Sequence, residues 1–446
     1  MKERMSSSMS KALQDVPRSA RASKIDPRIL LLALGMFALG TDALVVAGVL
    51  PEIAHATMVS ESLAGQLVTA FTLTYGLGAP VLAALTNRWS RTRVLVIALF
   101  GFCLANVGSA LAPTFPLLVL TRILAGGCAA THSPLAYATS TQLSPPEKRG
   151  QALALVVSGF TLATVLGSPL GTWVGEHAGW RLSFALVAAL AGIACVALLA
   201  SRLPRAAAQP SLSLQTRLAP VREPRLLLAL CPTLLSSLGF YLVYTYIAPL
   251  LGQTMHISDI SELLIASGLG SVVGSWISGS VADRFGTTRS LVVSLLGLSI
   301  ILAIFSWATT GLLTGLPALF LWGGAAASIF TPQQHRLLSL APAHVNVILA
   351  LNNAALYLGA AGGAMLGGVA LHVLPVTQLG WVGASFALLG LLLLLLSLRV
   401  SATGSGSRDA LIEDLPGKER TTLIERVGTL RKTQARLRET EKGNTS

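Results

Sequence analysis

Long runs of apolar residues alternate with short polar breaks from about residue 29 to about residue 399. Each run is long enough for a helix that rises about 1.5 Å per residue to cross a hydrocarbon core of about 30 Å. The pattern therefore predicts an all-α integral membrane protein with twelve transmembrane helices in two six-helix bundles. The predicted helices cover residues 29–50, 63–86, 94–112, 116–140, 151–175, 181–203, 225–250, 261–283, 290–309, 315–337, 346–371 and 380–399.

The longest internal break, residues 204–224, is rich in Pro, Ser and Arg and divides the predicted helices six from six. A repeat supports this division, because AALTNRWSRTR (83–93) follows the second helix and GSVADRFGTTR (279–289) follows the eighth. Equivalent loops in two halves indicate gene duplication and predict a substrate path between the halves near mid-membrane. The predicted domains are an N-terminal tail 1–28, a first bundle 29–203, the linker 204–224, a second bundle 225–399 and a charged tail 400–446.

The predicted tail opens with SATGSGSR (401–408), a composition typical of a flexible linker, and continues as a strongly charged segment. A disordered, solvated tail is one expectation for it. The alternative is a short amphipathic helix that lies on the membrane or on a partner, since several apolar residues share one helical face. These residues are Leu423, Val427, Leu430 and Leu437.

Composition and charge agree with the membrane assignment. Hydrophobic residues make up 53% of the chain and charged residues 11%, which is far from the balance of a soluble domain. The formal net charge is +13, but the basic residues gather in the tails, the linker and alternate loops, and only Arg122 and Arg181 fall outside this set. That positive-inside pattern predicts both termini in the cytoplasm. The sequence lacks the basic face with aromatic platforms that a nucleic-acid interface needs, and its first 27 residues hold no apolar signal-peptide core.

Asp42 is the only carboxylate deep inside an apolar run, where an ionised group costs at least ~2.5–3.5 kcal/mol unless it is paired or hydrated. It could be a proton carrier, an ion ligand or a substrate counter-charge, or else part of a structural ion pair. Arg122 is a candidate partner, because the two residues lie at similar depths of roughly 12 and 9 Å from the outer ends of helices 1 and 4. Breaking or drying such a pair would favour proton uptake by Asp42, which can tie protonation to a conformational switch.

Other intramembrane residues offer weaker chemistry. His132 in helix 4 could relay protons, or it could be hydrogen-bonded to a backbone carbonyl or to Ser133. Helix 5 contains a run of small residues and a proline, which suits close packing or a flexing seam; they are Gly159, Gly167, Pro169 and Gly171. In the second half, aromatic and amide side chains suit a neutral, amphipathic substrate, although each could equally bind helix to helix. The candidate cavity residues are Tyr241, Tyr244, Asn352, Asn353 and Tyr357.

Together these residues resemble the major facilitator superfamily, specifically its twelve-spanner drug:proton antiporters, over about residues 29–400. The segment 279–289 is similar to the family's G-x-x-x-D-R-x-G gate loop, and the resemblance implies gating roles for Gly279, Asp283, Arg284, Gly286 and Arg289. The first-half copy departs from the motif, with Ala83, Asn87 and Ser90 in place of Gly, Asp and Gly, but it keeps Arg88.

Four further segments carry the resemblance. LTRILAGG (120–127) looks like the helix-4 motif whose arginine is linked to proton coupling, which implies that role for Arg122. The run 159–171 looks like the helix-5 antiporter motif, which favours export. LGTDALVVAGVLPEIA (39–54) and GWRLSF (179–184) look like the bacterial branch that contains sugar-efflux and chloramphenicol-resistance exporters of the inner membrane. In many such relatives an acidic residue stands one position later, where this chain has Ala43.

The sequence therefore predicts a monomeric, proton-driven exporter of small amphipathic compounds, which is not an enzyme and needs no metal or other cofactor. It contains no Walker A loop for direct use of ATP. One alternative is an uptake symporter or facilitator on the same fold. Another is a membrane sensor or assembly protein that transports nothing. A channel fits poorly, since no ring of charges marks a pore.

Overall fold

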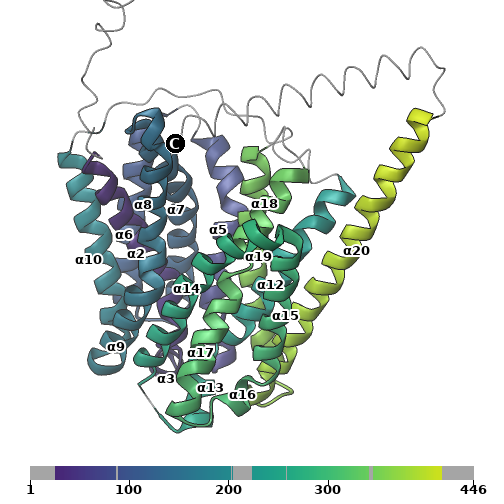
Figure 1. Ribbon diagram of the computed structural model, residues 1–446. Helices are drawn as coiled ribbons and strands as arrows, with labels where there is room; N and C mark the ends of the chain where they lie inside the picture. Colours follow the sequence, from purple (N-terminus) through teal and green to yellow (C-terminus); the bar gives the residue numbers. More distant parts are fainter. Residues whose placement is uncertain are drawn as a thin grey trace, which may run out of the picture.

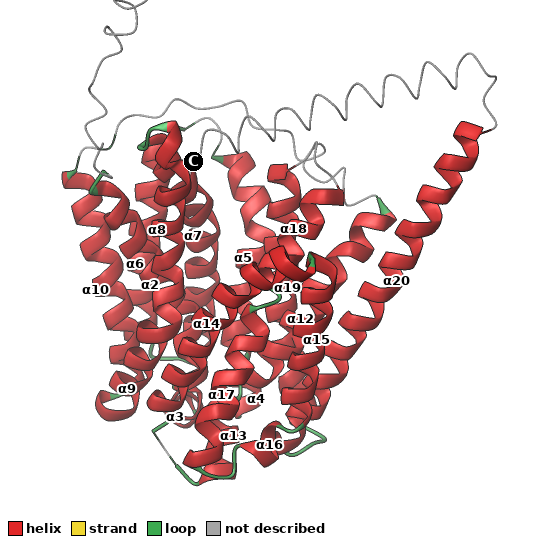
Figure 2. Cartoon of the chain, viewed as in Figure 1, coloured by secondary structure: helices red, strands yellow, loops and turns green. Residues whose placement is uncertain are grey.

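The structure is a computed structural model that describes residues 26–86, 89–201, 203, 223–257, 259–340 and 345–413, with backbone alone for 400–413. Asn87 and Arg88 of the predicted first gate loop lie outside the described residues. So do residues 1–25, 204–222 of the predicted linker and 414–446 of the predicted tail. The described part is helical throughout and contains no strand (Figure 2).

The first half of the chain forms six membrane-crossing helical units, two of them preceded or followed by short helices. They are α2 (Arg28–Gly48) with α3 (Leu50–Thr57), α4 (Glu61–Ala64) with α5 (Gln66–Leu85), α6 (Arg91–Leu111), α7 (Phe115–Gln142), α8 (Arg149–Leu162) with the π-helix η2 (Ala163–Gly167) and α9 (Ser168–Ala178), and α10 (Trp180–Ala200). The one-turn helix η1 (Pro146–Lys148) leads into α8.

The second half repeats the plan. Its units are α12 (Pro224–Tyr244) with α13 (Ile247–Met255), α14 (Ser261–Phe285), α15 (Thr287–Ala303) with α16 (Phe305–Ala308), α17 (Leu312–Ala327) with α18 (Phe330–Leu340), α19 (Val345–Ala370), and η5 (Val376–Gln378) with α20 (Leu379–Glu413). Ten described helical stretches are long and apolar enough to cross a membrane, and α5 and the shorter α15 complete twelve. The predicted twelve-helix, all-α membrane fold is confirmed. Helices suit this environment because they satisfy their backbone groups within the segment.

Two predicted features differ from the structure. The last spanning helix was expected to end at 399, but α20 continues to Glu413, through the residues that the sequence predicted as flexible linker. A continued helix keeps its backbone hydrogen bonds, and each interior glycine lowers its stability by only about 1 kcal/mol. The predicted helix at 151–175 is divided by the π-turn η2, which comes just before Pro169. A π-turn inserts one extra residue into a helix and is often found at functional sites.

The first helix of each half breaks in the same way. The chain leaves α2 at Val49 (φ −105°, ψ 18°) and leaves α12 through Tyr246 (φ −110°, ψ 25°). The short helices that follow contain Pro51 and Pro249, and they end in left-handed conformations at Met58 and His256. Pro51 and Pro249 stand the same number of residues before these left-handed positions.

We call the side where α2 begins and α20 ends the terminal face, and the opposite side, with α3, α9 and α13, the far face (Figure 1). Hydrogen bonds between the halves gather toward the far face. Ser62 donates to the carbonyl oxygen of Gly368 at 2.7 Å, and Tyr246 lies 3.4 Å from the carbonyl oxygen of Ser62. Toward the terminal face α20 leans away from the helices of the first half (Figure 1). The structure is therefore a conformation closed at the far face.

Candidate transport site

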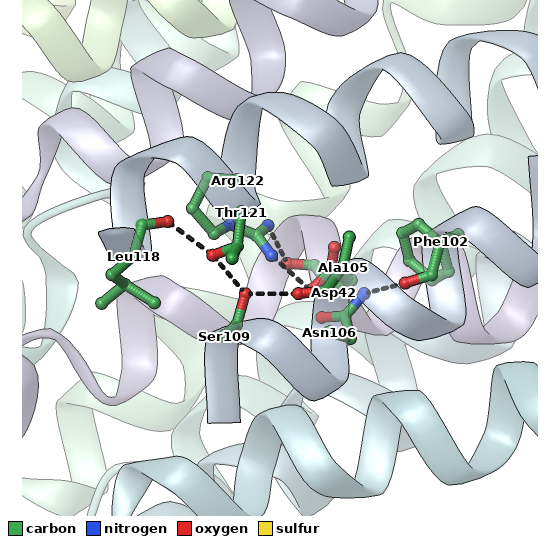
Figure 3. Close-up of polar contacts among 8 residues, drawn as sticks. All are labelled: Asp42, Phe102, Ala105, Asn106, Ser109, Leu118, Thr121 and Arg122. Atoms are coloured by element: carbon green, nitrogen blue, oxygen red, sulfur yellow. Dashed lines mark hydrogen bonds and ion pairs between the residues drawn. The ribbon is translucent and has the colours of Figure 1, made fainter. Parts of the chain in front are cut away.

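The candidate site centres on an ion pair inside the first bundle. Arg122 Nη1 on α7 donates to Asp42 Oδ1 on α2 at 2.7 Å, and Arg122 Nη2 lies 3.3 Å from the carbonyl oxygen of Asp42 (Figure 3). The Asp42 side chain is 0% exposed and that of Arg122 is 1% exposed. The sequence expectation that the two residues meet at similar depth is thus confirmed by the geometry.

The guanidinium is held in place by aromatic rings as well as by the carboxylate. Its central carbon lies 4.6 Å from the centroid of the Phe71 ring and 5.4 Å from that of Phe184. Such cation–π contacts contribute about 0.5–2 kcal/mol each, and more where water is excluded. The two rings come from α5 and α10, so four helices converge on the pair.

One oxygen of the carboxylate remains open. Asp42 Oδ2 is buried and accepts no hydrogen bond, and the neighbouring Asn106 on α6 has a buried Oδ1 that also lacks a partner (Figure 3). Asn106 Nδ2 donates to the carbonyl oxygen of Phe102 at 3.1 Å. Beside them, Ser109 and Thr121 form a hydroxyl pair at 2.8 Å that ties α6 to α7. Asn106 is thus the uncharged polar side chain beside the open carboxylate oxygen.

The small residues of helix 5 pack directly on the helix that carries Asp42. A Cβ atom at Gly159 would collide with the carbonyl oxygen of Ala33, and one at Gly167 with the hydroxyl of Thr41. A Cβ at Gly171 would lie 2.6 Å from Val45 Cγ2. These contacts show the close packing that one of the two sequence hypotheses requires, and a flexing seam stays a prediction.

The π-turn joins this packing to the other half of the molecule. On one side Ala163 of η2 faces Gly40, at 2.7 Å from the position of a Cβ there. On the other side Gly268 of α14 packs on the backbone of Thr164 and Val165. The π-turn thus touches both the Asp42 helix and the seam between the halves.

His132 does not contact the ion pair. Its Nδ1 lies 3.1 Å from the carbonyl oxygen of Leu95, while its Nε2 is buried without a partner and faces Gly35. Gly35 and Asp42 are seven residues apart on α2, which corresponds to about 10 Å along the helix. The structure therefore places this imidazole two turns from the carboxylate, bonded to a backbone carbonyl as one of the two sequence hypotheses held. Its role in proton transfer stays a prediction.

The tyrosines of helix 7 occupy different places. The Tyr244 hydroxyl lies 3.2 Å from Ser168 Oγ and 3.4 Å from the carbonyl oxygen of Leu44, so it links α12 to both α9 and α2 of the first half. Tyr241 is only partly buried and stands edge-on to Tyr244, with ring centroids 5.9 Å apart. Tyr244 therefore reaches the segment two residues beyond Asp42.

The candidate residues of helix 11 separate into two groups. Asn352 is buried within the second bundle, where its Oδ1 accepts from Thr233 at 2.6 Å. Asn353 is exposed, and Tyr357 stacks on Tyr75 of the first half with ring centroids 3.7 Å apart and an interplanar angle of 22°. Tyr75 in turn donates to Ser133 Oγ at 2.7 Å.

Sequence reasoning missed several of these residues. Tyr75 carries no signal beyond its place in an apolar run, and it becomes notable only because the fold sets it against Tyr357. Trp322 of α17 is fully buried and stacks on Phe240 at 4.5 Å. Arg336 near the end of α18 is 5% exposed, and its Nη2 donates to Ser397 Oγ at 2.6 Å. The sequence could have pointed to Arg336, because it is a charged residue near the end of an apolar run.

The second-half gate loop lies at the terminal face between α14 and α15. Gly286 has φ +89°, a conformation that side chains rarely adopt, whereas a Cβ at Gly279 would meet nothing within 4 Å. Asp283, Arg284 and Arg289 are exposed, and none forms an ion pair with another described residue. In this conformation the loop is therefore not engaged across the seam by described charges.

Two bundles of six membrane-spanning helices, with a buried ion pair in one of them, define a multi-pass membrane transporter and not an enzyme. The family profile of the Major Facilitator Superfamily matches residues 32–364, and the chain belongs to that superfamily. It is 32% identical over 379 residues to the inner membrane transport protein YdhP of Escherichia coli K12, covering 84% of this chain and 97% of that protein.

Another relative is named for a resistance function. The chain is 35% identical over 259 residues to a chloramphenicol resistance protein of Streptomyces lividans, covering 57% of this chain and 66% of that protein. Among solved structures, a D-xylose-proton symporter superposes with a TM-score of 0.67 at 20% identity, over 82% of this chain and 96% of the other. That similarity supports the fold alone.

Proposed function

We propose that this protein is a proton-coupled exporter of small amphipathic compounds that works by alternating access across a bacterial inner membrane. The observation that carries the proposal is the buried Asp42–Arg122 pair with its open carboxylate oxygen. In this proposal the terminal face is cytoplasmic, as the basic residues predict. The far-face-closed structure is then the inward-facing state, and the working unit is a monomer.

Asp42 is the proton carrier in this scheme. In the ion pair its charge is balanced by Arg122, which offsets part of the cost of burial. A proton that arrives on Oδ2 neutralises the carboxylate, can be shared with Asn106 Oδ1, and weakens the attraction to Arg122. Arg122 then remains between Phe71 and Phe184, which favour a cation even without the carboxylate.

The protonation change can reach the seam through two contacts. Gly40 and Thr41 pack on η2, whose other side bears on Gly268 of the second half. Leu44, two residues after Asp42, accepts from Tyr244 of α12. A small shift of α2 therefore moves groups that hold the two halves together, which is the coupling that alternating access requires.

The aromatic groups near mid-membrane favour a largely neutral substrate. Tyr75 and Tyr357 meet face to face between the halves, and Tyr241 is partly exposed nearby in the second bundle. Such rings bind apolar faces of a ligand, and their hydroxyls supply a few hydrogen bonds. Compounds of the chloramphenicol type and sugars are the first candidates, because relatives and structural neighbours bear those names.

An uptake symporter on the same scaffold is the second candidate, because the fold alone does not set the direction of transport. The helix-5 glycines that pack on α2 fit the exporter better, since the run resembles an antiporter motif. Direction of transport separates the two. An exporter accumulates substrate in inside-out vesicles with an acidic lumen, and a symporter releases it there.

The test is transport of labelled chloramphenicol and xylose in vesicles that contain the purified full chain, with and without an imposed pH gradient. We expect gradient-driven accumulation of one compound, lost with a protonophore. Asp42→Asn should lose accumulation but keep exchange of substrate for substrate. Asp26→Asn is the matched control, because Asp26 lies outside the membrane beside Arg28. Accumulation by Asp42→Asn with an unchanged pH dependence would overturn the assignment of Asp42.

A further inference from the structure

Three carboxylic acids meet on the far face, where the two halves touch. Glu176 ends α9 in the first half, Asp259 stands just before α14 in the second half, and Glu52 of α3 is close enough to Glu176 to interact with it. Ligand atoms of Glu176, His177 and Asp259 all lie within 4.8 Å of one another. The cluster thus spans the seam that is closed in this structure.

Glu176 is the member that bridges the seam. Its Oε1 accepts from the backbone N–H of Ile260, at the start of α14, with a distance of 3.3 Å. Its Oε2 is buried and has no hydrogen-bond partner. Asp259 is instead bound within its own half, where Oδ1 accepts from the N–H of Ser261 at 2.9 Å and from its hydroxyl at 2.5 Å.

Because Asp259 carries a negative charge, the protonation of Glu176 decides whether the two carboxyl groups repel each other or form a hydrogen bond. Burial alone would raise the pKa of Asp259, but hydrogen bonds from Ser261, the adjacent Glu176 carboxyl and nearby His177 hold that pKa below its ordinary value. Asp259 is therefore a carboxylate at neutral pH. An ionised Glu176 would face it with a buried, unpartnered oxygen, whereas a protonated Glu176 can donate from Oε2.

His177 is the basic group within this cluster, and no salt bridge of the described residues pairs Glu176 or Asp259. His177 stacks on Trp173 and its Nδ1 lies 3.0 Å from the Trp173 carbonyl oxygen. Arg181 of α10 donates to the carbonyl oxygen of Ala112 at 2.9 Å. Glu262 in the first turn of α14 is exposed. The seam at Glu176 is therefore acidic on both sides.

We propose that Glu176 is a proton-operated latch on the far face, which holds α14 of the second half when protonated and releases it when ionised. In the protonated form Oε1 keeps the N–H of Ile260 and the new O–H donates to Asp259. In the ionised form Glu176 and Asp259 carry like charges on the two sides of the seam, and opening the far face separates them. The inference rests on the transporter fold and does not require that Asp42 couples transport to protons.

The latch is tested by the distance between spin labels on either side of the far face. Labels at Ala56→Cys and Leu313→Cys, both exposed, are placed in full-length protein whose four native cysteines are replaced by alanine. In nanodiscs, distances are measured from about pH 5 to about pH 9, a range that covers a carboxyl in an acidic, partly buried setting. We expect the ratio of closed to open populations to fall about tenfold or more, since each pKa unit of difference between states changes it tenfold.

Variants decide whether Glu176 is the group that makes the closed-to-open ratio depend on pH. Glu176→Gln imitates the protonated acid and should stay closed over the whole range, while Glu262→Gln should titrate like the wild type. A Glu176→Gln protein that still opens as pH rises, or a wild type that does not respond to pH, overturns the proposal. So does closure at low pH that is lost on adding EDTA, because a bound cation would then hold the seam. If Asp42→Asn abolishes the response and Glu176→Gln does not, the sensor is Asp42 instead.

Discussion

Arg122 holds Asp42 by both its side chain and its main chain, with Nη1 2.7 Å from Oδ1 and Nη2 3.3 Å from the carbonyl oxygen. The main-chain contact survives when the carboxylate is neutral. Arg122 can therefore stay near α2 while Asp42 gains and loses a proton. The contact between α2 and α7 therefore persists while the charge of the Asp42 side chain changes.

The first prediction concerns the energy of this pair. Asp42→Asn and Arg122→Gln should each lower the free energy of unfolding by about 3–5 kcal/mol, because each leaves a buried group without its partner. The double variant should lose clearly less than the sum of the two, as measured by denaturation in micelles. Asp26→Asn, which removes a 3.8 Å pair at a partly exposed site, should change it by less than about 1 kcal/mol. Additive losses at Asp42 and Arg122 would show that the contact contributes little.

The second prediction concerns the seam at the π-turn. Gly268→Ala puts a Cβ against the Thr164 carbonyl and 2.7 Å from Val165 Cα, so it should disfavour the far-face-closed state. Overpacking costs about 1–3 kcal/mol, which shifts the closed-to-open ratio roughly five- to 150-fold. The same spin-label pair measures it. Gly150→Ala is the control, since a Cβ at this first-turn position of α8 meets nothing within 4 Å, and equal shifts in both variants would refute the seam as the cause.

The third prediction separates the ring of Tyr75 from its hydroxyl. Tyr75→Phe keeps the stack on Tyr357 but loses the bond to Ser133, whereas Tyr75→Leu loses both. A hydrogen bond contributes about 0.5–1.5 kcal/mol, so Tyr75→Phe should lower the free energy of unfolding by about that amount, as measured by denaturation in micelles. Tyr75→Leu should lower it further, because a stacked pair contributes about as much again. Identical losses for the two variants would mean that the stack on Tyr357 adds nothing to stability.

The fourth prediction is a pH dependence of stability that arises at Glu52. Burial raises the pKa of Glu52 above its ordinary 4.5, partly offset by a backbone hydrogen bond. An acid with a raised pKa in the fold stabilises it below the unfolded pKa, and this contribution is lost as pH rises through the folded pKa. The apparent Tm in micelles should therefore fall as pH rises from about 4.5 toward neutrality. Glu52→Gln should reduce that slope, and Glu61 and Glu176, whose pKa values burial also raises, supply the rest of it.

Asp259 acts in the opposite sense, since its pKa is lowered, but its contribution disappears only as pH falls below its ordinary value of 3.8. Asp259 therefore does not change the slope of Tm against pH above that value. Glu262→Gln, an exposed acid on the same face, should keep the wild-type slope. A slope in Glu52→Gln as steep as in the wild type would assign the effect to another group.

The sequence was informative where a single residue contradicts its surroundings. Asp42 and Arg122 stand out because charge is costly in an apolar helix, and counting residues from the helix ends placed them at one depth. The twelve helices followed from length and hydropathy for the same reason. Glu176 and Asp259 gave no such signal, because acids are ordinary in short loops and these two are far apart in the chain.

Features made by packing between helices were beyond the sequence. The stack of Tyr75 on Tyr357 depends on which helices of the two halves are neighbours. The π-turn at 163–167 accommodates Gly40 on one side and Gly268 on the other, so neither side alone determines it. The helical course of α20 beyond 399 was missed because Gly and Ser indicate a linker by composition, whereas an established helix tolerates them.

The breaks after α2 and α12 have the same backbone shape, although the side chains around them differ. Met58 and His256 hold left-handed conformations that glycine would adopt at lower cost, and neither position has become glycine. Their neighbours differ in almost every residue, yet a proline stands at the same spacing before each. The two halves therefore share a backbone path at this bend, although the side chains that form it differ. The shape of the bend at each extramembrane end is more alike between the halves than the residues that encode it.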